Sequence, residues 1–362
     1  MTTMPSGSTD GTAPRLEKSA KNPTISNVAS LAGVAKSTVS AVINNKTTIK
    51  ESTRRNVLRA IDELNYRPSR SAQRGFRHVV QRSISLIIKE PENTYYAEVL
   101  SGVQDVAMDR GYLVFVSSSQ GQSGLERRIV EQCMEREIDG LLIAPIRNDE
   151  TDLSHIFELK RRNIHFVLLE NMQGVPTSLV DVDNVKASAD AVRYLIQEGH
   201  SRIVHFAGPH YSEHSRARAE GVRRAFSHSP LAYNDSMIVP CGDSHDAGYR
   251  VGLEYFGATL NPQERPTAVT CYNDLVALGL MRALRELNIS VPDEISLIGF
   301  DDLHMLQLFP QQLTTVRVPK YEMGRQAAEL LMRDIESKTK AAPEKVCLET
   351  ELIIRDTTRR IL

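Results

Sequence analysis

Apolar residues near the start of the chain recur every three or four positions, as one face of a helix requires. Three such groups lie between residues 24 and 64, and Gly33 separates the first two. A helix often ends in a left-handed residue, a conformation that glycine adopts freely. The groups are Val28, Ala29 and Leu31, then Val39, Val42 and Ile43, then Val57, Ile61 and Leu64. The pattern predicts three short helices, the first two forming a helix-turn-helix.

From Ile84 onward, continuous apolar runs alternate with helical stretches. The runs cover residues 84–88, 112–118, 140–144, 165–170, 202–208, 268–273 and 295–302, and helical patterns cover 95–110, 184–198, 213–227 and 275–287. Continuous apolar strands separated by helices indicate parallel sheets covered on both faces. The strands are too many for one ordinary sheet. We therefore predict an α/β fold with two doubly wound parallel-sheet subdomains behind a small helical domain.

Charge divides the chain at the same place. Residues 15–82 hold 14 Lys and Arg against 4 Asp and Glu, a net charge of +10, whereas the residues after 82 hold 30 against 40, a net charge of −10. The near-neutral total of −1 thus hides a basic head on an acidic body. A basic head is the electrostatic footprint of a nucleic-acid contact. A helical domain with a solvated basic face is the alternative.

The second helix has the outer face that DNA reading needs. Its outward positions are all small or polar: Lys36, Ser37, Ser40, Ala41 and Asn44. Such a surface suits a helix that enters the major groove.

The segment GVAKSTVSAVIN, followed by LNYRPSRSAQ, resembles the DNA-binding headpiece and hinge of the lac repressor/gal repressor family. The resemblance covers residues 24 to 362. It implies a dimeric transcriptional regulator, usually a repressor, that binds a palindromic operator under the control of a small molecule. It also implies a disordered arm (1–22), a helix-turn-helix domain (23–67), a hinge helix and linker (68–82) and a periplasmic-binding-protein-like core (83–362). In that core the N-subdomain spans about 83–180 and 317–345, and the C-subdomain about 181–316 and 346–362.

The same resemblance assigns DNA contacts. Lys36 and Ser37 would reach base edges, and the remaining contacts would be Thr24, Thr38, Ser40, Ala41, Asn44, Thr48, Lys50, Thr53, Tyr66, Ser69, Ala72 and Gln73. Solvation alone also explains a surface polar residue, and Thr24 could simply cap the first helix. Ala41 stands where the family often has Arg, and Gly75 stands where a leucine wedges into the minor groove. We therefore expect an operator unlike those of the best-known members.

Polar residues follow several predicted strands, at the sheet edge where α/β folds bind ligands. These are Glu90, Glu170, Asn273 and Asp301. The resemblance adds Arg218, Tyr95 and Tyr96 as effector contacts, and it implies that Asn273 and Asp301 bond the effector. The set suits a sugar-like or other polar metabolite. Alternatively, Asp274 caps a helix, Glu90 is a loop residue and the tyrosines are core. The aromatic that often stacks on the ligand is replaced by Ser244.

Other classes of protein fit less well. The sequence contains no run of 18 apolar residues, so we expect no membrane-spanning helix. The first 23 residues lack the apolar stretch of a signal peptide. We expect a cytoplasmic, nucleoid-associated homodimer with no membrane partner. The cysteines (Cys133, Cys241, Cys271 and Cys347) are widely spaced, so buried thiols are favoured over disulfides or metal ligands. We expect no metal and no cofactor besides the effector.

Two further functions remain open at this stage. A solute-binding protein for uptake would suit the core, but not the basic head or the missing signal peptide. An enzyme would need a recognisable motif, and GxGxxG, GxxxxGK[ST], GxSxG and HExxH are all absent. The absence of a C-terminal leucine heptad favours a dimer over a coiled-coil tetramer.

Overall fold

The chain divides into two compact units, residues 1–79 and 80–362, here called the headpiece and the core. The computed structural model describes residues 24–43, 46, 48–64, 66, 82–147, 152–172, 174–257, 264–337 and 342–361. The predicted arm (1–22) and nearly all of the predicted hinge and linker (68–82), including Gly75, lie outside these residues.

Three helices form the headpiece: α1 (Ile25–Ala32), α2 (Lys36–Ile43) and α3 (Glu51–Glu63). Gly33 ends α1 with a φ of 65°, as the turn requires. Val28, Val39 and Val57 are fully buried between the helices. Leu31 is 47% exposed, which corrects its assignment to the apolar face. Val28 and Ala29 already fill the contact face of this eight-residue helix.

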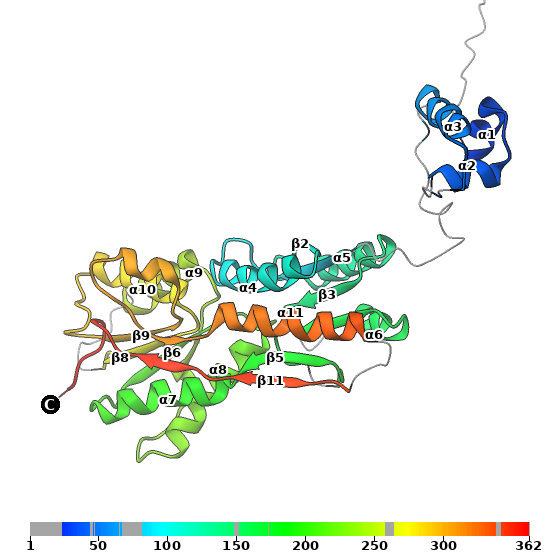
Figure 1. Ribbon diagram of the computed structural model, residues 1–362. Helices are drawn as coiled ribbons and strands as arrows, with labels where there is room; N and C mark the ends of the chain where they lie inside the picture. The colour runs from blue at the N-terminus through cyan, green and yellow to red at the C-terminus, as the bar shows by residue number, and fades with distance from the viewer. Residues whose placement is uncertain are drawn as a thin grey trace, which may run out of the picture. The chain divides into compact units, whose positions relative to one another are not determined.

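Two six-stranded sheets organise the core (Figure 1). The first sheet is parallel throughout, in the order β11-β5-β4-β3-β1-β2. Its strands are β1 (Ser83–Ile88), β2 (Leu113–Ser118), β3 (Gly140–Ile143), β4 (His165–Leu168), β5 (Ser178–Val182) and β11 (Lys345–Leu348). The second sheet has the order β12-β10-β9-β8-β6-β7, and only its edge strand β12 is antiparallel. Its strands are β6 (Ile203–Ala207), β7 (Ile238–Pro240), β8 (Ala268–Cys271), β9 (Ser296–Asp301), β10 (Thr314–Arg317) and β12 (Glu351–Ile353). The predicted fold class is confirmed.

Each sheet carries its own helices, and together they make two subdomains. The first subdomain has α4 (Tyr95–Asp109), α5 (Ser123–Glu135), α6 (Ser154–Arg161) and α11 (Lys320–Glu336). The second has α7 (Asn184–Gln197), α8 (Glu213–Ser227), α9 (His245–Gly257) and α10 (Asp274–Glu286), with the short 3₁₀ helices η2 (Asp235–Met237) and η3 (His304–Leu308). The helices predicted from the apolar pattern match α4, α7, α8 and α10 to within one residue at each end.

Glycines allow the helix pairs to pack closely. A Cβ on Gly102 of α4 would collide with the carbonyl of Tyr321, and one on Gly324 of α11 would collide with the carbonyl of Val99. The pairs α7–α8 and α9–α10 have the same feature, at Gly221 and at Gly248 and Gly279. Backbone therefore meets backbone in all three pairs.

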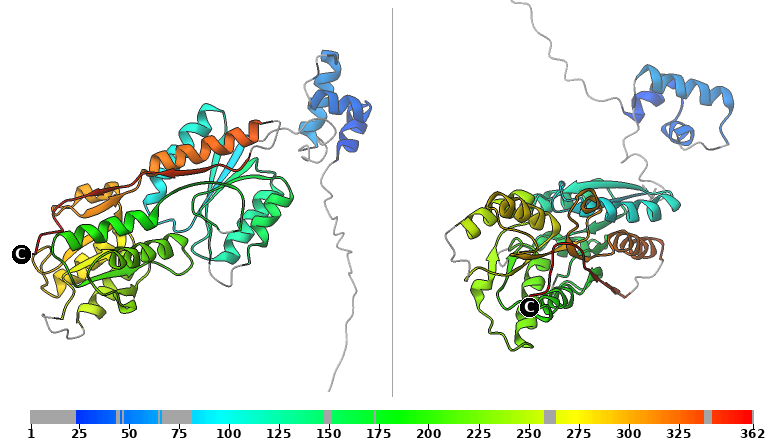
Figure 2. Two further views of the ribbon diagram at one scale, coloured as in Figure 1. Left: turned by 90° about the horizontal axis from the view of Figure 1, so that it is seen from below. Right: turned by 90° about the vertical axis from the view of Figure 1, so that its left-hand side faces the viewer.

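The chain crosses between the subdomains three times: at Asp183, at Val318–Pro319 and at Glu349–Thr350. Figure 2 shows the last crossing, where the dark red chain runs from β11 to the C-terminus on the second subdomain. The third boundary was expected at 346. It lies after Leu348, because β11 pairs with β5 through that residue.

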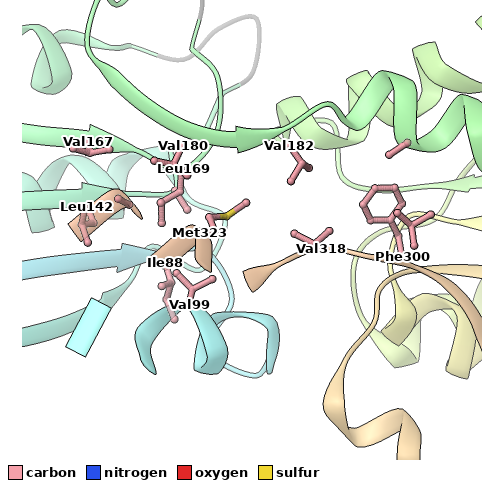
Figure 3. Packing of buried hydrophobic residues seen from close by; sticks show 14 of the residues in the cluster. Ile88, Val99, Leu142, Val167, Leu169, Val180, Val182, Phe300, Val318 and Met323 are labelled. Atoms are coloured by element: carbon pink, nitrogen blue, oxygen red, sulfur yellow. The ribbon is translucent and has the colours of Figure 1, made fainter. Parts of the chain in front are cut away.

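An apolar cluster continues through the crossings (Figure 3). Val182 and Val318 lie there, with Met323 of the first subdomain on one side and Phe300 of the second on the other. Their side chains are at most 6% exposed. The two subdomains therefore share buried apolar contacts as well as polar ones.

Candidate DNA-reading surface and effector site

The predicted base-reading residues open the second helix of the headpiece. Lys36 and Ser37 are exposed in the first turn of α2. The carbonyl of Ala35 accepts the amide hydrogen of Thr38 at 2.9 Å, and alanine has no side-chain acceptor for a cap. Ala35 therefore provides no side-chain cap for the first-turn amides of α2, and the side chains of Lys36 and Ser37 remain exposed beside them.

The remaining predicted DNA contacts fall into three groups. Thr24, Thr48 and Lys50 are exposed, and Thr38, Ser40, Ala41 and Thr53 are half-buried. Tyr66 is only 6% exposed, and its ring belongs to the headpiece core. Asn44, Ser69, Ala72 and Gln73 lie outside the described residues. Thr24 forms a capping box with Asn27, whose side-chain oxygen accepts the Thr24 amide hydrogen at 2.9 Å.

In the core, Arg218 is the central cation of the candidate effector site. It lies on α8 and is 4% exposed. Its Nε donates to Asn184 Oδ1 at 2.9 Å, Nη1 donates to the Tyr272 carbonyl, and Nη2 lies 3.6 Å from Asp301 Oδ1. The guanidinium also stacks on the Phe300 ring, 3.6 Å from its centroid. A planar cation held by three oxygen groups and an aromatic face is fixed in orientation.

Asp301 ends β9 in a conformation that L-residues rarely adopt, with a φ of 114°. Lys320 Nζ donates to the carbonyls of Asp301 and Asp302, at 2.6 and 2.9 Å. Burial raises the pKa of the Asp301 carboxyl to about 6, although Arg218 acts in the opposite direction. Backbone strain beside a buried carboxyl is typical of functional sites.

Glu170 follows β4 and is buried among donors. It pairs with Lys89, accepts from Ser212 Oγ at 2.9 Å and accepts the His214 backbone amide at 2.7 Å. Burial would raise the pKa of Glu170, but His214 and Lys89 outweigh it and hold that pKa at about 2. The carboxylate is therefore ionised at any physiological pH.

Glu90 follows β1 and meets an acid of the second subdomain. Tyr211 Oη lies 3.0 Å from Glu90 Oε1 and 2.8 Å from Asp243 Oδ2. A phenol has one proton, so it can donate to only one of the two carboxylates at a time. Burial and the neighbouring Asp243 raise the pKa of Glu90 to about 7.

The two tyrosines predicted to line the site stand at the start of α4. Both are half-buried, with ring centroids 5.2 Å apart and ring planes at 86°. Burial raises the pKa of both phenols, and Asp301 adds to the effect on Tyr95 and Glu90 to that on Tyr96. Both rings therefore lie near predicted effector residues.

Asn273 is bonded within the chain through both polar atoms. Its Oδ1 accepts the Val276 amide at 2.8 Å and caps α10, while Nδ2 donates to the Asp243 carbonyl at 2.8 Å. The alternative that Asp274 is the cap is therefore wrong. Asp274 instead accepts from Leu303 N and Thr315 Oγ1, at 2.9 and 2.6 Å, and is fully buried.

Sequence reasoning missed the segment Tyr211–His214, here called the β6–α8 segment. It belongs to the second subdomain, yet all four of its residues contact the first. The Tyr211 carbonyl accepts from Arg147 N at 2.9 Å, and Arg147 Nη1 pairs with Glu213 at 2.8 Å. Ser212 bonds Glu170, as described above, and His214 Nε2 lies 3.0 Å from Asp181 Oδ1.

Other residues of the network were also missed: Lys89, Asp181 and Tyr272. The position of Lys89, next to Glu90 at the end of a strand, was the available signal. The partners of the β6–α8 segment lie 32 to 123 residues away in sequence, so no local pattern could indicate them.

Within the described residues, no cluster of three or more His, Cys, Asp or Glu side chains could hold a metal ion. No helix of that part of the chain is long and apolar enough to cross a membrane. All four cysteines are free thiols; Cys133 and Cys271 are buried, Cys241 is half-buried and Cys347 is exposed on β11.

Comparison with known proteins places this architecture in a family. Residues 24–69 match the bacterial regulatory proteins of the lacI family, and residues 192–358 match a periplasmic binding protein-like domain. The chain is 31% identical over 351 residues to the HTH-type transcriptional repressor PurR of Vibrio vulnificus (strain CMCP6), covering 93% of this chain and 99% of the relative. It is 32% identical over 343 residues to PurR of Haemophilus influenzae (strain PittEE), covering 94% and 99%.

Solved structures agree. A complex of the transcriptional regulator CelR with cellobiose superposes with a TM-score of 0.69 at 28% identity, covering 92% of this chain and 99% of that one. The lac repressor dimer bound to operator and the anti-inducer ONPF has the same fold, with a TM-score of 0.69 at 24% identity, covering 94% and 100%. The headpiece match and the near full-length relatives together establish that the chain belongs to the lacI family of bacterial transcriptional regulators.

Proposed function

We propose that the protein is a cytoplasmic repressor that binds a palindromic operator as a homodimer, under the control of a small molecule held between its two subdomains. One observation carries the proposal. A helix-turn-helix unit shares the chain with a core in which Glu90, Glu170, Arg218 and Asp301 converge at the facing carboxyl ends of two parallel sheets.

Lys36 and Ser37 would read bases, since both are exposed where α2 begins. The other exposed headpiece side chains, among them Thr48 and Lys50, would contact phosphates. The relatives are named as repressors, and we propose no catalytic activity and no cofactor besides the effector.

The effector would be a polar metabolite with several hydrogen-bonding groups. Each of the four converging side chains already bonds within the chain, so an effector must replace those partners with groups of its own. A polyhydroxylated or nitrogenous molecule can do this, whereas an apolar one would leave buried charges unpaired.

Selection of bound sequences from a random DNA library, with the full-length protein at fixed salt, tests the DNA half of the proposal. We expect a palindrome to be enriched, because a symmetric dimer presents two α2 helices to two half-sites. The selection is repeated with a metabolite extract, in case binding needs a corepressor. Failure to enrich any sequence in both conditions would contradict the proposal.

A further inference from the structure

The β6–α8 segment of the second subdomain makes polar contacts with the first subdomain through all four of its residues. Its side chains face three carboxylates of the first subdomain: Glu90, Glu170 and Asp181. If the subdomains separated, all of these contacts would break at once. The protonation state of the groups in this interface therefore bears on whether the subdomains stay closed.

His214 is the imidazole of this interface. It lies 3.0 Å from Asp181 on β5, its own amide donates to Glu170 after β4, and the carboxyl of Asp301 and the guanidinium of Arg218 are its other charged neighbours. Burial by itself would lower the pKa of His214, but Glu170 and Asp181 outweigh it and raise that pKa above its ordinary value.

Glu90 is the second group. It faces Tyr211 and Asp243 of the second subdomain, with Lys89 beside it and Tyr96 and Tyr272 nearby. No ion pair joins Glu90 or Asp243 to a cation among the residues that the structure describes. Closure thus brings together two carboxyl groups with one phenolic proton between them.

We propose that closure of the two subdomains is coupled to proton uptake by His214 and Glu90, so that acidification favours the closed arrangement. The consequence for regulation rests on the proposed function, because the closed arrangement is the one that would retain an effector. In that case effector affinity, and with it the response at the operator, depends on intracellular pH.

Protonation of His214 and protonation of Glu90 both favour closure. The pKa of His214 is higher in the closed form than the ordinary 6.5, so protonation stabilises closure below that pH and the gain disappears as the pH rises through the closed-form pKa. The pKa of Glu90 is about 7 here, above its ordinary 4.5, because of burial and the neighbouring Asp243. Separation of the subdomains would take Asp243 away from Glu90, so ionisation of Glu90 opposes closure.

Two other carboxyl groups do not reverse this pH dependence of closure. The pKa of Glu170 is held at about 2 by His214 and Lys89, so that group titrates well below physiological pH. The pKa of Asp301 is raised to about 6 and adds to the same trend. If Glu90 regains its ordinary pKa of 4.5 when the subdomains separate, the ratio of closed to open protein should fall about tenfold between pH 6 and pH 8 from this group alone.

Hydrogen–deuterium exchange of the full-length protein, without DNA or added ligand, tests the coupling. The protection factor of peptides covering 211–218 is compared at pH 6 and pH 8, each referred to the unfolded-chain rate at that pH. We expect about tenfold more protection at pH 6 in the wild type. The dependence should fall to the small part due to Asp301 in the Glu90→Gln/His214→Gln double variant, whereas His228→Gln, at an exposed histidine that ends α8, should keep it in full.

An unchanged protection factor across this pH range in the wild type, or a double variant that retains the dependence in full, would overturn the proposal. If the double variant fails to fold, the pKa values of the histidine side chains in the wild-type protein are measured by NMR titration instead. The resonance that is absent from the His214→Gln variant belongs to His214, and its pKa must lie above 6.5. A pKa at or below 6.5 refutes the coupling. Neither measurement involves DNA or effector, so failure here is distinct from failure of the operator selection.

Discussion

Arg218, the central cation of the candidate effector site, is held in one orientation by its own chain. Each of its three guanidinium nitrogens faces an oxygen, from Asn184, Tyr272 or Asp301. The side chain is therefore positioned before any ligand arrives. A ligand that bonds Arg218 gains from this fixed orientation, because little further side-chain entropy is lost.

Replacing Arg218 by alanine should destabilise the core by about 3–5 kcal/mol, because it leaves the buried Asp301 carboxyl without its cation. The pKa of Asp301, already raised to about 6 by burial, should rise further, because Arg218 is the strongest of the cations that lower it. A raised carboxyl pKa means that stability falls as the pH rises through it, so the deficit should be larger at pH 8 than at pH 5.

Denaturant unfolding at the two pH values measures this effect. The second change Asp301→Asn should restore most of the lost stability and remove the added pH dependence. A single Arg218→Ala variant as stable as the wild type at pH 8 would show that the pair is not coupled. The proposed function adds that Arg218→Ala abolishes the response to the effector.

At the headpiece, Lys36→Ala should relax base preference at one position of each half-site, with a loss of discrimination of about 1–3 kcal/mol. The reason is that Lys36 is exposed in the first turn of α2. Library selection with the variant measures this, and Lys345→Ala, which removes an exposed lysine of the core, is the control. An identical sequence preference in the variant would remove Lys36 from the base-reading set.

Among the elements, the paired helices of the core depend on bare backbone where they cross. Gly102 and Gly324 both face backbone carbonyls of the opposite helix, so α4 and α11 touch without side chains between them. Because the contacting atoms are backbone atoms, no change of side-chain rotamer could make room for an added methyl group. Gly221, three residues after Arg218, has the same role against Val185, which gives α8 a fixed position on α7.

Gly324→Ala should therefore lower the free energy of unfolding by at least about 1–3 kcal/mol, because the added methyl group forces the helices apart. Gly124→Ala is the matched control. Gly124 lies in α5, and a Cβ there meets nothing within 4 Å, so alanine should stabilise the protein by up to about 1 kcal/mol. Thermal or denaturant unfolding of the two variants gives the comparison, and equal effects would refute the packing argument.

The elements that the sequence predicted well are those whose pattern follows from their own burial. Strands such as 84–88 are buried along their whole length and apolar at every position except Ser85, as expected for a sheet covered on both faces. β5 contains Asp181, and β7 has three residues, so neither has such a run. The rule that ligands bind at strand ends placed Glu90, Glu170 and Asp301 in the candidate site, and their contact with an effector stays a prediction. It could not locate His214, whose role depends on Asp181 in the other subdomain.

For the whole molecule, the separation of charge is the property with the widest effect. The head (residues 15–82) carries +10, whereas the remainder after it carries −10. The acidic core should repel DNA, so only the head is attracted to it, and the orientation of approach is biased before any base is read.

Binding to random DNA should therefore weaken steeply with salt. A protein that makes 6–10 phosphate contacts loses roughly 10³–10⁵ in affinity between 50 and 200 mM salt. Fluorescence anisotropy with a labelled random duplex measures this slope. Affinity that is low and independent of salt would instead favour a solute-binding role for the core.

The position of the last two strands has a consequence for how the protein is made. β11 and β12 form an edge of the first and second sheets respectively, and both come from the final 18 residues of the chain. A ribosome that releases the chain in order therefore completes neither sheet until residues 345–353 have emerged, after all the other strands named above. Until then β5 and β10 are open edges that could pair with other chains. Nascent protein that stalls before residue 345 should depend on chaperones, whereas the finished chain should not.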